Sequence, residues 1–217
     1  MMIEFEQVSK QYANGYQALS QVNFSLDKGE LVFLTGHSGA GKSTMLRLIA
    51  RLETPSSGRI SVDGIHLAQL NKKEIAAFRS RLGVTFQSPH LLNDRNVYEN
   101  VALPLHIQRV NPTLISKRVH AALDRVGLLS KEKRLPKQLS QGEQQRVGIA
   151  RAIVHKPALL LADEPTGNLD PGLATEIMTL FHQFNEVGVS IIVATHDLPL
   201  IARMKHRIVM LKQGRLS

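Results

Sequence analysis

The stretch that decides the fold is Gly36-His37-Ser38-Gly39-Ala40-Gly41-Lys42-Ser43-Thr44, which matches the phosphate-loop pattern G-x-x-x-x-G-K-[ST]. The apolar run before it, 31–35, is typical of a buried parallel strand, and the run after it, 45–50, favours a helix. Glycines let backbone N–H groups turn toward a phosphate, and the helix N-terminus adds partial positive charge. We therefore expect 36–44 to bind a nucleotide, with Lys42 reaching the β- and γ-phosphate oxygens and the Ser43 hydroxyl binding Mg²⁺.

Composition sets broad limits on the class of protein. The 217 residues suffice for one large domain or a domain with an insertion, and 43% hydrophobic with 21% charged residues is ordinary for a globular protein. The sequence has no cysteine, so disulfides, thiolate zinc sites and a cysteine nucleophile are excluded, and a reducing compartment fits. No signal-peptide pattern and no apolar run of 18 residues is present, so we expect no membrane span. The net charge of +9 suits a polyanionic partner or an anionic membrane leaflet, or serves solubility alone.

The first 87 residues contain further strand patterns around the phosphate loop. Runs 3–8 and 22–26 alternate in strand fashion on either side of a turn at 13–15, which predicts an antiparallel β layer. Additional strands are expected at 58–64 and 82–86, and Asn71 to Glu74 resembles a capping box that begins a short helix.

Residues 88–139 differ in pattern, because apolar residues recur at helical spacing and β-branched runs disappear. Asn111-Pro112 fits the start of a helix and Gly127 fits its end. Within 109–137 there are eight Lys or Arg and two Asp or Glu, a net charge of +6. We interpret this segment as a basic helical insertion.

The rest of the chain alternates helices and strands. Helices are expected at 142–155 and 171–187, and strands at 158–162, 190–195 and 207–211. This alternation predicts an α/β fold with a parallel sheet, in which ligands bind at the carboxyl ends of the strands. Four polar or glycine positions fall at such ends: Gly36, Gln87, Asp163 and His196.

Each of these positions suits the chemistry of a nucleoside triphosphate, although the phosphate loop alone also fits kinases, GTPases and motors. Asp163 is expected to hold Mg²⁺ through water, and the adjacent Glu164 to polarise the attacking water as a general base; adjacent carboxylates also serve as helix N-cap charges. His196 is expected to contact the γ-phosphate and orient the water. Gln87 is expected to bind Mg²⁺ or water and to report phosphate loss to the helical insertion.

Two tyrosines near the N-terminus are candidates for binding a nucleotide base. Tyr12 is expected to stack on adenine, and Tyr16 competes with it for that role.

Taken together, the motifs resemble those of ATP-binding cassette (ABC) ATPases in order and spacing over nearly the whole chain. They are the phosphate loop, Gln87, Leu139-Ser140-Gln141-Gly142-Glu143, the run from Leu159 to Glu164, Gly167-Asn168-Leu169-Asp170, and His196. The resemblance implies one P-loop NTPase domain, with a RecA-like core and antiparallel β subdomain formed by 1–87 and 140–217, and an α-helical subdomain at about 88–139. It also implies a head-to-tail homodimer that sandwiches two ATP molecules with Mg²⁺.

In such a dimer, Ser140 and Gly142 would complete the nucleotide site of the partner subunit, and Asp170 would carry communication between the two sites. Gln141 departs from the family, which usually has glycine there. Its side chain either crowds the sandwich or requires a strained backbone, at about 1–3 kcal/mol if φ is positive. We expect weaker ATP-driven dimerisation than in a Gln141→Gly variant.

Within the ABC ATPases, the segments 35–43, 142–152 and 160–170 resemble the bacterial cell-division ATPases of the FtsE type, with His37 and Glu143-Gln144-Gln145 favouring that group. Lipoprotein-release ATPases of the LolD type and MacB-type exporters share part of the pattern. The FtsE resemblance implies a peripheral protein on the cytoplasmic face of the bacterial inner membrane. An FtsX-like membrane partner would dock near 88–139, and ATP turnover would regulate peptidoglycan hydrolysis. A third reading, prompted by the net charge of +9, is a soluble ABC ATPase that acts on nucleic acid. No nucleic-acid partner is expected, because aromatic-basic stacking platforms and recognition motifs are absent.

Overall fold

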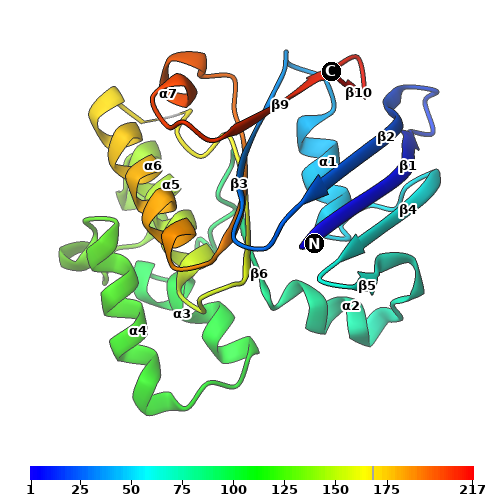
Figure 1. Cartoon of the computed structure of the whole chain (residues 1–217). Helices are drawn as coiled ribbons and strands as arrows, with labels where there is room; N and C mark the ends of the chain where they lie inside the picture. Colours follow the sequence, from blue (N-terminus) through cyan, green and yellow to red (C-terminus); the bar gives the residue numbers. More distant parts are fainter. Residues whose placement is uncertain (168) are drawn as a thin grey trace.

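A six-stranded sheet runs through the computed structural model, which describes residues 1–167 and 169–217 (Figure 1). Its strand order is β10-β9-β3-β8-β7-β6. The strands are β3 (Leu31–Thr35), β6 (Leu82–Thr85), β7 (Leu159–Asp163), β8 (Ser190–Ala194), β9 (Arg207–Lys212) and β10 (Arg215–Leu216). Neighbouring strands from β9 to β6 are parallel, as the alternation of helices and strands predicts, whereas β10 returns antiparallel to β9 through a short turn. The strand β10 was not expected from the sequence.

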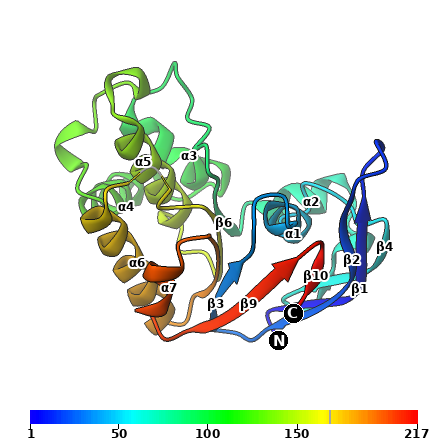
Figure 2. The same cartoon turned by 90° about the horizontal axis from the view of Figure 1, so that it is seen from above.

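The parallel strands are apolar along their whole length because both faces of the sheet are covered. In β8, Ile191 and Val193 pack on one side with helices that lie between residues 97 and 202, while Ile192 and Ala194 pack on the other side with α1 (Lys42–Ile49). Figure 2 shows α1 between this sheet and a second, four-stranded sheet. The phosphate loop therefore begins a helix that is buried between two sheets.

The second sheet is antiparallel and has the order β2-β1-β4-β5. Its strands are β1 (Ile3–Gln11), β2 (Gln17–Leu26), β4 (Ser57–Val62) and β5 (Ile65–His66), which confirms the predicted antiparallel layer. The predicted capping box is also present: Asn71 caps α2 (Lys72–Arg79) and Glu74 bonds back to the Asn71 amide.

Between β6 and β7 the chain is helical. It forms α3 (Val97–Ile107), α4 (Pro112–Arg125), 3₁₀ turns at Leu129–Lys131 and Pro136–Gln138, and α5 (Gln141–Ile153). Asn111 caps α4, Pro112 occupies its first turn and Gly127 follows it with φ of +66°, as expected. Since α5 packs against α3 and α4 as well as against β6, it connects this helical segment to the sheet.

The last helices are α6 (Pro171–Glu186), which precedes β8, and α7 (Leu198–Ala202), which precedes β9. Among the residues that the structure describes, no helix has both the length and the apolar character required to span a membrane.

Candidate nucleotide site

The phosphate loop lies at the carboxyl edge of the six-stranded sheet, between β3 and α1. Gly36, Gly39 and Gly41 have φ values of +148°, +76° and +108°, a region that side chains other than glycine rarely adopt. Gly41 begins α1 without a side-chain cap, so the first amides of this helix are available to an anion.

Two of the three glycines also lack room for a side chain. A Cβ at Gly36 would lie 2.2 Å from the Leu211 carbonyl oxygen, and a Cβ at Gly41 would lie 2.5 Å from the Ala18 carbonyl oxygen. A Cβ at Gly39 would meet nothing closer than 3.9 Å. The two glycines that the sequence pattern requires are therefore the two that neighbouring strands exclude from substitution.

Lys42 is buried, with 8% of its surface exposed, and its Nζ donates to the carbonyl oxygens of Gly36 (2.7 Å) and His37 (3.3 Å). These bonds hold the Lys42 ammonium group against the backbone of the phosphate loop. A buried cation beside free amides is suited to polyphosphate oxygens.

Asp163 ends β7 and is also 8% exposed. Burial raises the pKa of its carboxyl group, while the neighbouring Ser43 hydroxyl and the Lys42 charge oppose the increase. Its Oδ1 has no hydrogen-bond partner among the described residues. A buried carboxylate oxygen without a partner, beside a serine hydroxyl, provides the oxygen ligands that Mg²⁺ prefers.

Glu164 and His196 meet across the ends of β7 and β8. The Glu164 Oε1 lies 2.8 Å from the Nδ1 of His196, and the Glu164 backbone N–H donates to the Ala194 carbonyl at 2.8 Å. Glu164 has φ of +48°, a conformation that is costly for a side-chain-bearing residue and is found preferentially at functional sites. The Glu164 side chain is 12% exposed and that of His196 is 73% exposed, so the pair lies at the cavity surface.

One cavity of about 730 Å³ contains most of the predicted site residues. It is lined by the phosphate loop 36–44 together with Gln87, Asp163, Glu164 and His196. The structure adds lining residues that sequence reasoning did not select: Thr35, Leu198, Met210, Leu211 and Lys212. Met210 pairs with Thr35 across β9 and β3. Ligands bind at the carboxyl ends of parallel strands, and this rule, which selected Gln87, could also have selected the residues at the end of β9.

The two tyrosines occupy different positions. Tyr16 lines the cavity and donates from its hydroxyl to the Gly39 carbonyl at 2.5 Å, whereas Tyr12 does not line the cavity. The Tyr12 hydroxyl bonds to Glu53 (3.0 Å) and Thr44 (3.2 Å), and burial raises its pKa. The Tyr12 and Tyr16 rings are stacked nearly parallel beside the phosphate loop, with centroids 6.3 Å apart.

Ser140, Gln141 and Asp170 lie outside this cavity. Ser140 caps α5: its hydroxyl accepts from the Glu143 amide (3.3 Å), and the Glu143 carboxylate accepts from the Ser140 amide (3.0 Å). An ion pair with Lys131 lowers the pKa of Glu143, which therefore stays charged at the helix N-terminus. Glutamate at 143 thus completes a capping box.

Gln141 is exposed in the first turn of α5 and does not have positive φ. The expected alternative of a strained backbone is therefore wrong, because a helical first turn accommodates glutamine without strain. Crowding by the side chain is the alternative that remains.

Asp170 caps α6, with its Oδ1 accepting from the Leu173 amide at 3.1 Å. Asn168, which belongs to the same motif, lies outside the described residues.

Comparison with known proteins agrees with this geometry. Residues 19–167 match the model of the ABC transporter family, and the chain belongs to that family of ATP-hydrolysing cassettes. The cell division ATP-binding protein FtsE of Escherichia coli (strain K12) is 55% identical over 215 residues, covering 99% of this chain and 97% of the relative. FtsE of Bacillus subtilis (strain 168) is 43% identical, covering 98% of this chain and 93% of the relative. The predicted resemblance to the ABC ATPases of the FtsE type is confirmed.

Solved structures give the same result for the fold. The dimeric structure of the ATP-binding cassette MJ0796 in a post-hydrolysis state, bound to ADP and Pi, has a TM-score of 0.94 and 36% identity, and covers 100% of this chain and 97% of that chain. The structure of cbiO1 from Clostridium perfringens has a TM-score of 0.87 and 33% identity, and covers 100% and 86% respectively. The predicted P-loop ABC fold and ATP hydrolase activity are thus confirmed, and ATP is the nucleotide.

Proposed function

We propose that this chain is the ATPase subunit of a bacterial membrane complex that acts in cell division, in which ATP turnover regulates peptidoglycan hydrolysis through an FtsX-like integral membrane partner. The observation that carries the proposal is the full-length similarity to FtsE proteins from several bacteria. The cavity residues support the ATPase part, because they combine an anion-binding loop with a carboxylate pair and a histidine.

Within the site, Ser43 and Gln87 would hold Mg²⁺ directly and Asp163 would hold it through water. The buried Asp163 Oδ1, for which the described part of the chain supplies no hydrogen-bond partner, fits this assignment. When bound, the ion would neutralise charge that develops on the β- and γ-phosphate oxygens. Lys42 and the amides of 36–44 would hold the phosphates, and Tyr12, with Tyr16 beside it, would stack on adenine.

Glu164 would act as the general base that takes a proton from the attacking water. The Nδ1 atom of His196 forms a 2.8 Å hydrogen bond with the Glu164 Oε1 atom, which supports a role for His196 in orienting that carboxylate. The other ring nitrogen, Nε2, would then be free to contact the γ-phosphate.

We further propose that two copies associate head to tail on ATP, with Ser140 and Gly142 of each copy at the phosphates of the other. Their position at the exposed start of α5, outside the cavity of their own chain, supports a contribution across an interface. Asp170 would connect the two sites through α6.

The proposed route from nucleotide to membrane partner runs through the loop after Gln87 into the α-helical subdomain, 88–139. Gln145 of α5 donates to the Phe86 carbonyl at 3.2 Å, and Arg151 of α5 donates to the carbonyls of Pro89 and His90. A displacement of Gln87 would therefore be transmitted to α5. The membrane partner would dock near 88–139, with the chain peripheral to the cytoplasmic face of the inner membrane.

The test is purification of the tagged chain from detergent-solubilised membranes of its own cells, together with its depletion. We expect a four-span membrane protein to co-purify and depleted cells to form filaments. A lipoprotein-sorting defect with normal division would instead assign the chain to lipoprotein release, and would overturn the proposal.

A further inference from the structure

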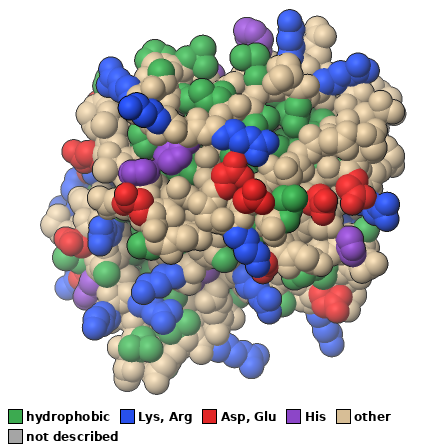
Figure 3. Space-filling view, in the orientation of Figure 1, with side chains coloured by type: hydrophobic (Ala, Val, Ile, Leu, Met, Phe, Trp, Pro, Cys, Tyr) green, Lys and Arg blue, Asp and Glu red, His purple; other side chains and the backbone are tan. Residues whose placement is uncertain are grey.

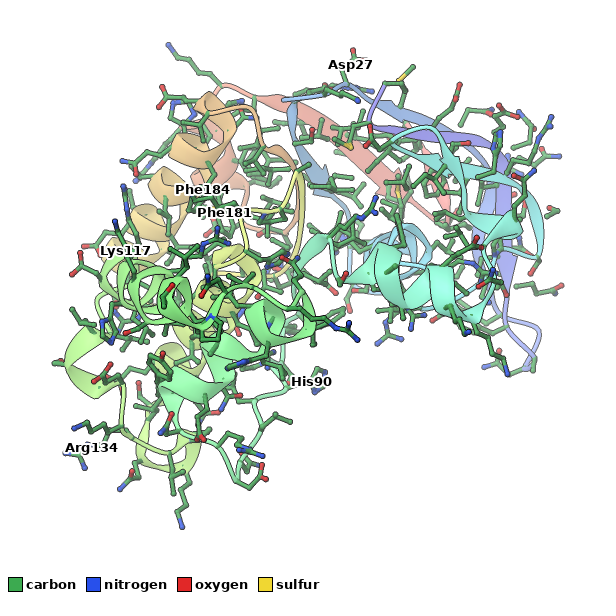
Figure 4. All side chains as sticks on the ribbon, turned by 90° about the horizontal axis from the view of Figure 1, so that it is seen from below. Asp27, His90, Lys117, Arg134, Phe181 and Phe184 are labelled. Carbon is green, nitrogen blue, oxygen red and sulfur yellow. The ribbon has the colours of Figure 1, made fainter. Side chains whose placement is uncertain are left out.

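The turn between β1 and β2 carries Tyr16 to the edge of the phosphate loop. The Tyr16 hydroxyl donates to the Gly39 carbonyl at 2.5 Å, although the two residues are 23 positions apart in the chain. Tyr16 is 50% exposed, so burial alone does not fix its position. Figure 4 shows this turn, in blue at the right, across the molecule from Lys117 and Arg134 of the α-helical subdomain. The contact therefore belongs to the nucleotide cavity and not to the α-helical subdomain.

The turn that carries Tyr16 is fixed by its own hydrogen bonds. The Tyr12 amide donates to the Tyr16 carbonyl and the Gly15 amide donates to the Tyr12 carbonyl, both at 2.9 Å. The Asn14 side chain accepts from the Tyr16 amide at 3.1 Å, and Gly15 supplies a φ of +83°. The backbone of Tyr16 is thus held in place independently of the phosphate loop.

The two ends of the phosphate loop are held by packing, whereas its middle is not. A Cβ at Gly36 or at Gly41 would lie 2.2 Å or 2.5 Å from a backbone carbonyl oxygen of a neighbouring strand. At Gly39 the nearest atom in the described part of the chain, apart from the adjacent residues, is the Tyr16 hydroxyl oxygen, 3.9 Å from such a Cβ. Because glycine is conformationally permissive, hydrogen bonds must supply the restraint that packing does not give at this position.

A second turn, between β9 and β10, holds the next carbonyl of the loop. The Gly214 amide donates to the Ala40 carbonyl at 3.2 Å, and Lys212, at the start of this turn, lines the nucleotide cavity. Figure 3 shows Lys and Arg side chains at the upper right of the molecule, over this turn and β10. The bond to Ala40 joins two backbone groups, so no side-chain change removes it. The bond to Gly39, by contrast, depends on one hydroxyl group.

The peptide group between Gly39 and Ala40 is bonded at both of its ends. Its carbonyl accepts from Tyr16, and its N–H donates to the His37 carbonyl at 3.0 Å. Since a peptide group is planar, two bonds on opposite sides fix the orientation of the whole plane. The neighbouring amides of the loop are then held in place before a ligand arrives, and such preorganisation increases affinity because less freedom is lost on binding.

We propose that Tyr16 is a positioning residue for nucleotide binding, whose hydroxyl holds the Gly39–Ala40 peptide so that the phosphate loop is ordered before a polyphosphate binds. The residue acts through the loop and not through the base, so this role is separate from the stacking of Tyr12 on adenine. The inference rests on the binding of phosphates by 36–44 in the proposed function, and it is independent of the membrane partner.

The experiment uses Tyr16→Phe, which keeps the ring beside Tyr12 and removes only the hydroxyl. The affinities of the full-length chain for MgATP and for inorganic tripolyphosphate are measured by competition with a fluorescent ATP analogue. Loss of one neutral hydrogen bond should weaken binding about threefold to tenfold. The factor should be the same for both ligands, because tripolyphosphate has no base or ribose. In steady-state phosphate release, KM for ATP should rise by a similar factor while kcat stays unchanged.

The matched control is Tyr98→Phe, which removes a tyrosine hydroxyl on α3, outside the nucleotide cavity, and should change neither affinity nor KM. Urea unfolding verifies that both variants fold. The proposal is overturned if Tyr16→Phe binds tripolyphosphate as tightly as the wild type, including the case in which only ATP binding weakens, because Tyr16 would then contact the nucleoside. It is also overturned if kcat falls while KM is unchanged. If Lys42→Ala loses ATP binding and Tyr16→Phe does not, only this inference fails; if neither variant affects binding, the assignment of 36–44 fails with it.

Discussion

Substitution of Gly41 by alanine tests why the phosphate loop requires glycine. Gly41 has φ of +108°, and an added Cβ would lie 2.5 Å from the Ala18 carbonyl oxygen and 2.9 Å from a Leu19 methyl carbon. The matched control is Gly39→Ala in the same loop, with φ of +76° and nothing within 3.9 Å of the added carbon. Both changes strain the backbone, but only the first forces β2 and the loop apart.

The two costs can be separated. An alanine at positive φ costs about 1–2 kcal/mol, and this applies to both variants. Insertion of a methyl group where no space exists adds about 1–3 kcal/mol, and this applies to Gly41→Ala alone. We expect losses of about 2–5 kcal/mol for Gly41→Ala and about 1–2 kcal/mol for Gly39→Ala.

Urea unfolding of the two variants measures this difference directly, and a fluorescent ATP analogue measures the accompanying change in nucleotide binding. Because the Gly41 amide lies at the start of α1, the displaced loop should also bind nucleotide at least tenfold more weakly. Equal unfolding midpoints for Gly41→Ala and Gly39→Ala would refute the steric explanation.

Four further changes test the proposed roles of the site. Glu164→Gln should keep ATP binding and lose at least a hundredfold in turnover, because the general base is removed. Lys42→Ala should instead lose ATP binding. Measurements of steady-state phosphate release and of nucleotide binding distinguish the two variants. Gln141→Gly should strengthen ATP-driven dimerisation, measured by size-exclusion chromatography, because a crowding side chain is removed. Asp163→Asn should raise the free energy of unfolding at about pH 8 while lowering Mg²⁺-dependent turnover, since burial raises the pKa of Asp163.

The sign of the Asp163 effect follows from proton binding. A carboxyl group whose pKa is raised in the folded protein contributes stability below its unfolded pKa, and that contribution is lost as the pH rises through the folded pKa. The gain from asparagine should therefore shrink as the pH is lowered through this window, as urea unfolding at several pH values would show. A gain that is independent of pH would exclude the burial explanation. Near-normal turnover of Glu164→Gln would show that Glu164 is not the general base. Equal ATP-driven dimerisation of the wild type and Gln141→Gly would show that the Gln141 side chain does not crowd the dimer.

Local patterns were sufficient for much of the fold. Several features depend on residues within a few positions of one another. They are the phosphate loop, the strands before Gln87, Asp163 and His196, and the caps at Asn71 and Asn111. Turn, cap and strand preferences act over that range, so the sequence carries them directly. The short strand β10 escaped prediction because two residues contain too little pattern.

The sequence by itself determined that this protein has a phosphate loop at the start of a helix, a parallel sheet and the motifs of an ABC ATPase. Only the tertiary structure decided that β3 lies between β8 and β9, which brings Met210 beside the loop and the Leu211 carbonyl against Gly36. It also decided that Tyr16 lines the cavity and that Gln141 is helical. The physical reason is that these contacts join residues far apart in the chain, and their geometry depends on strand order and packing rather than on local preference.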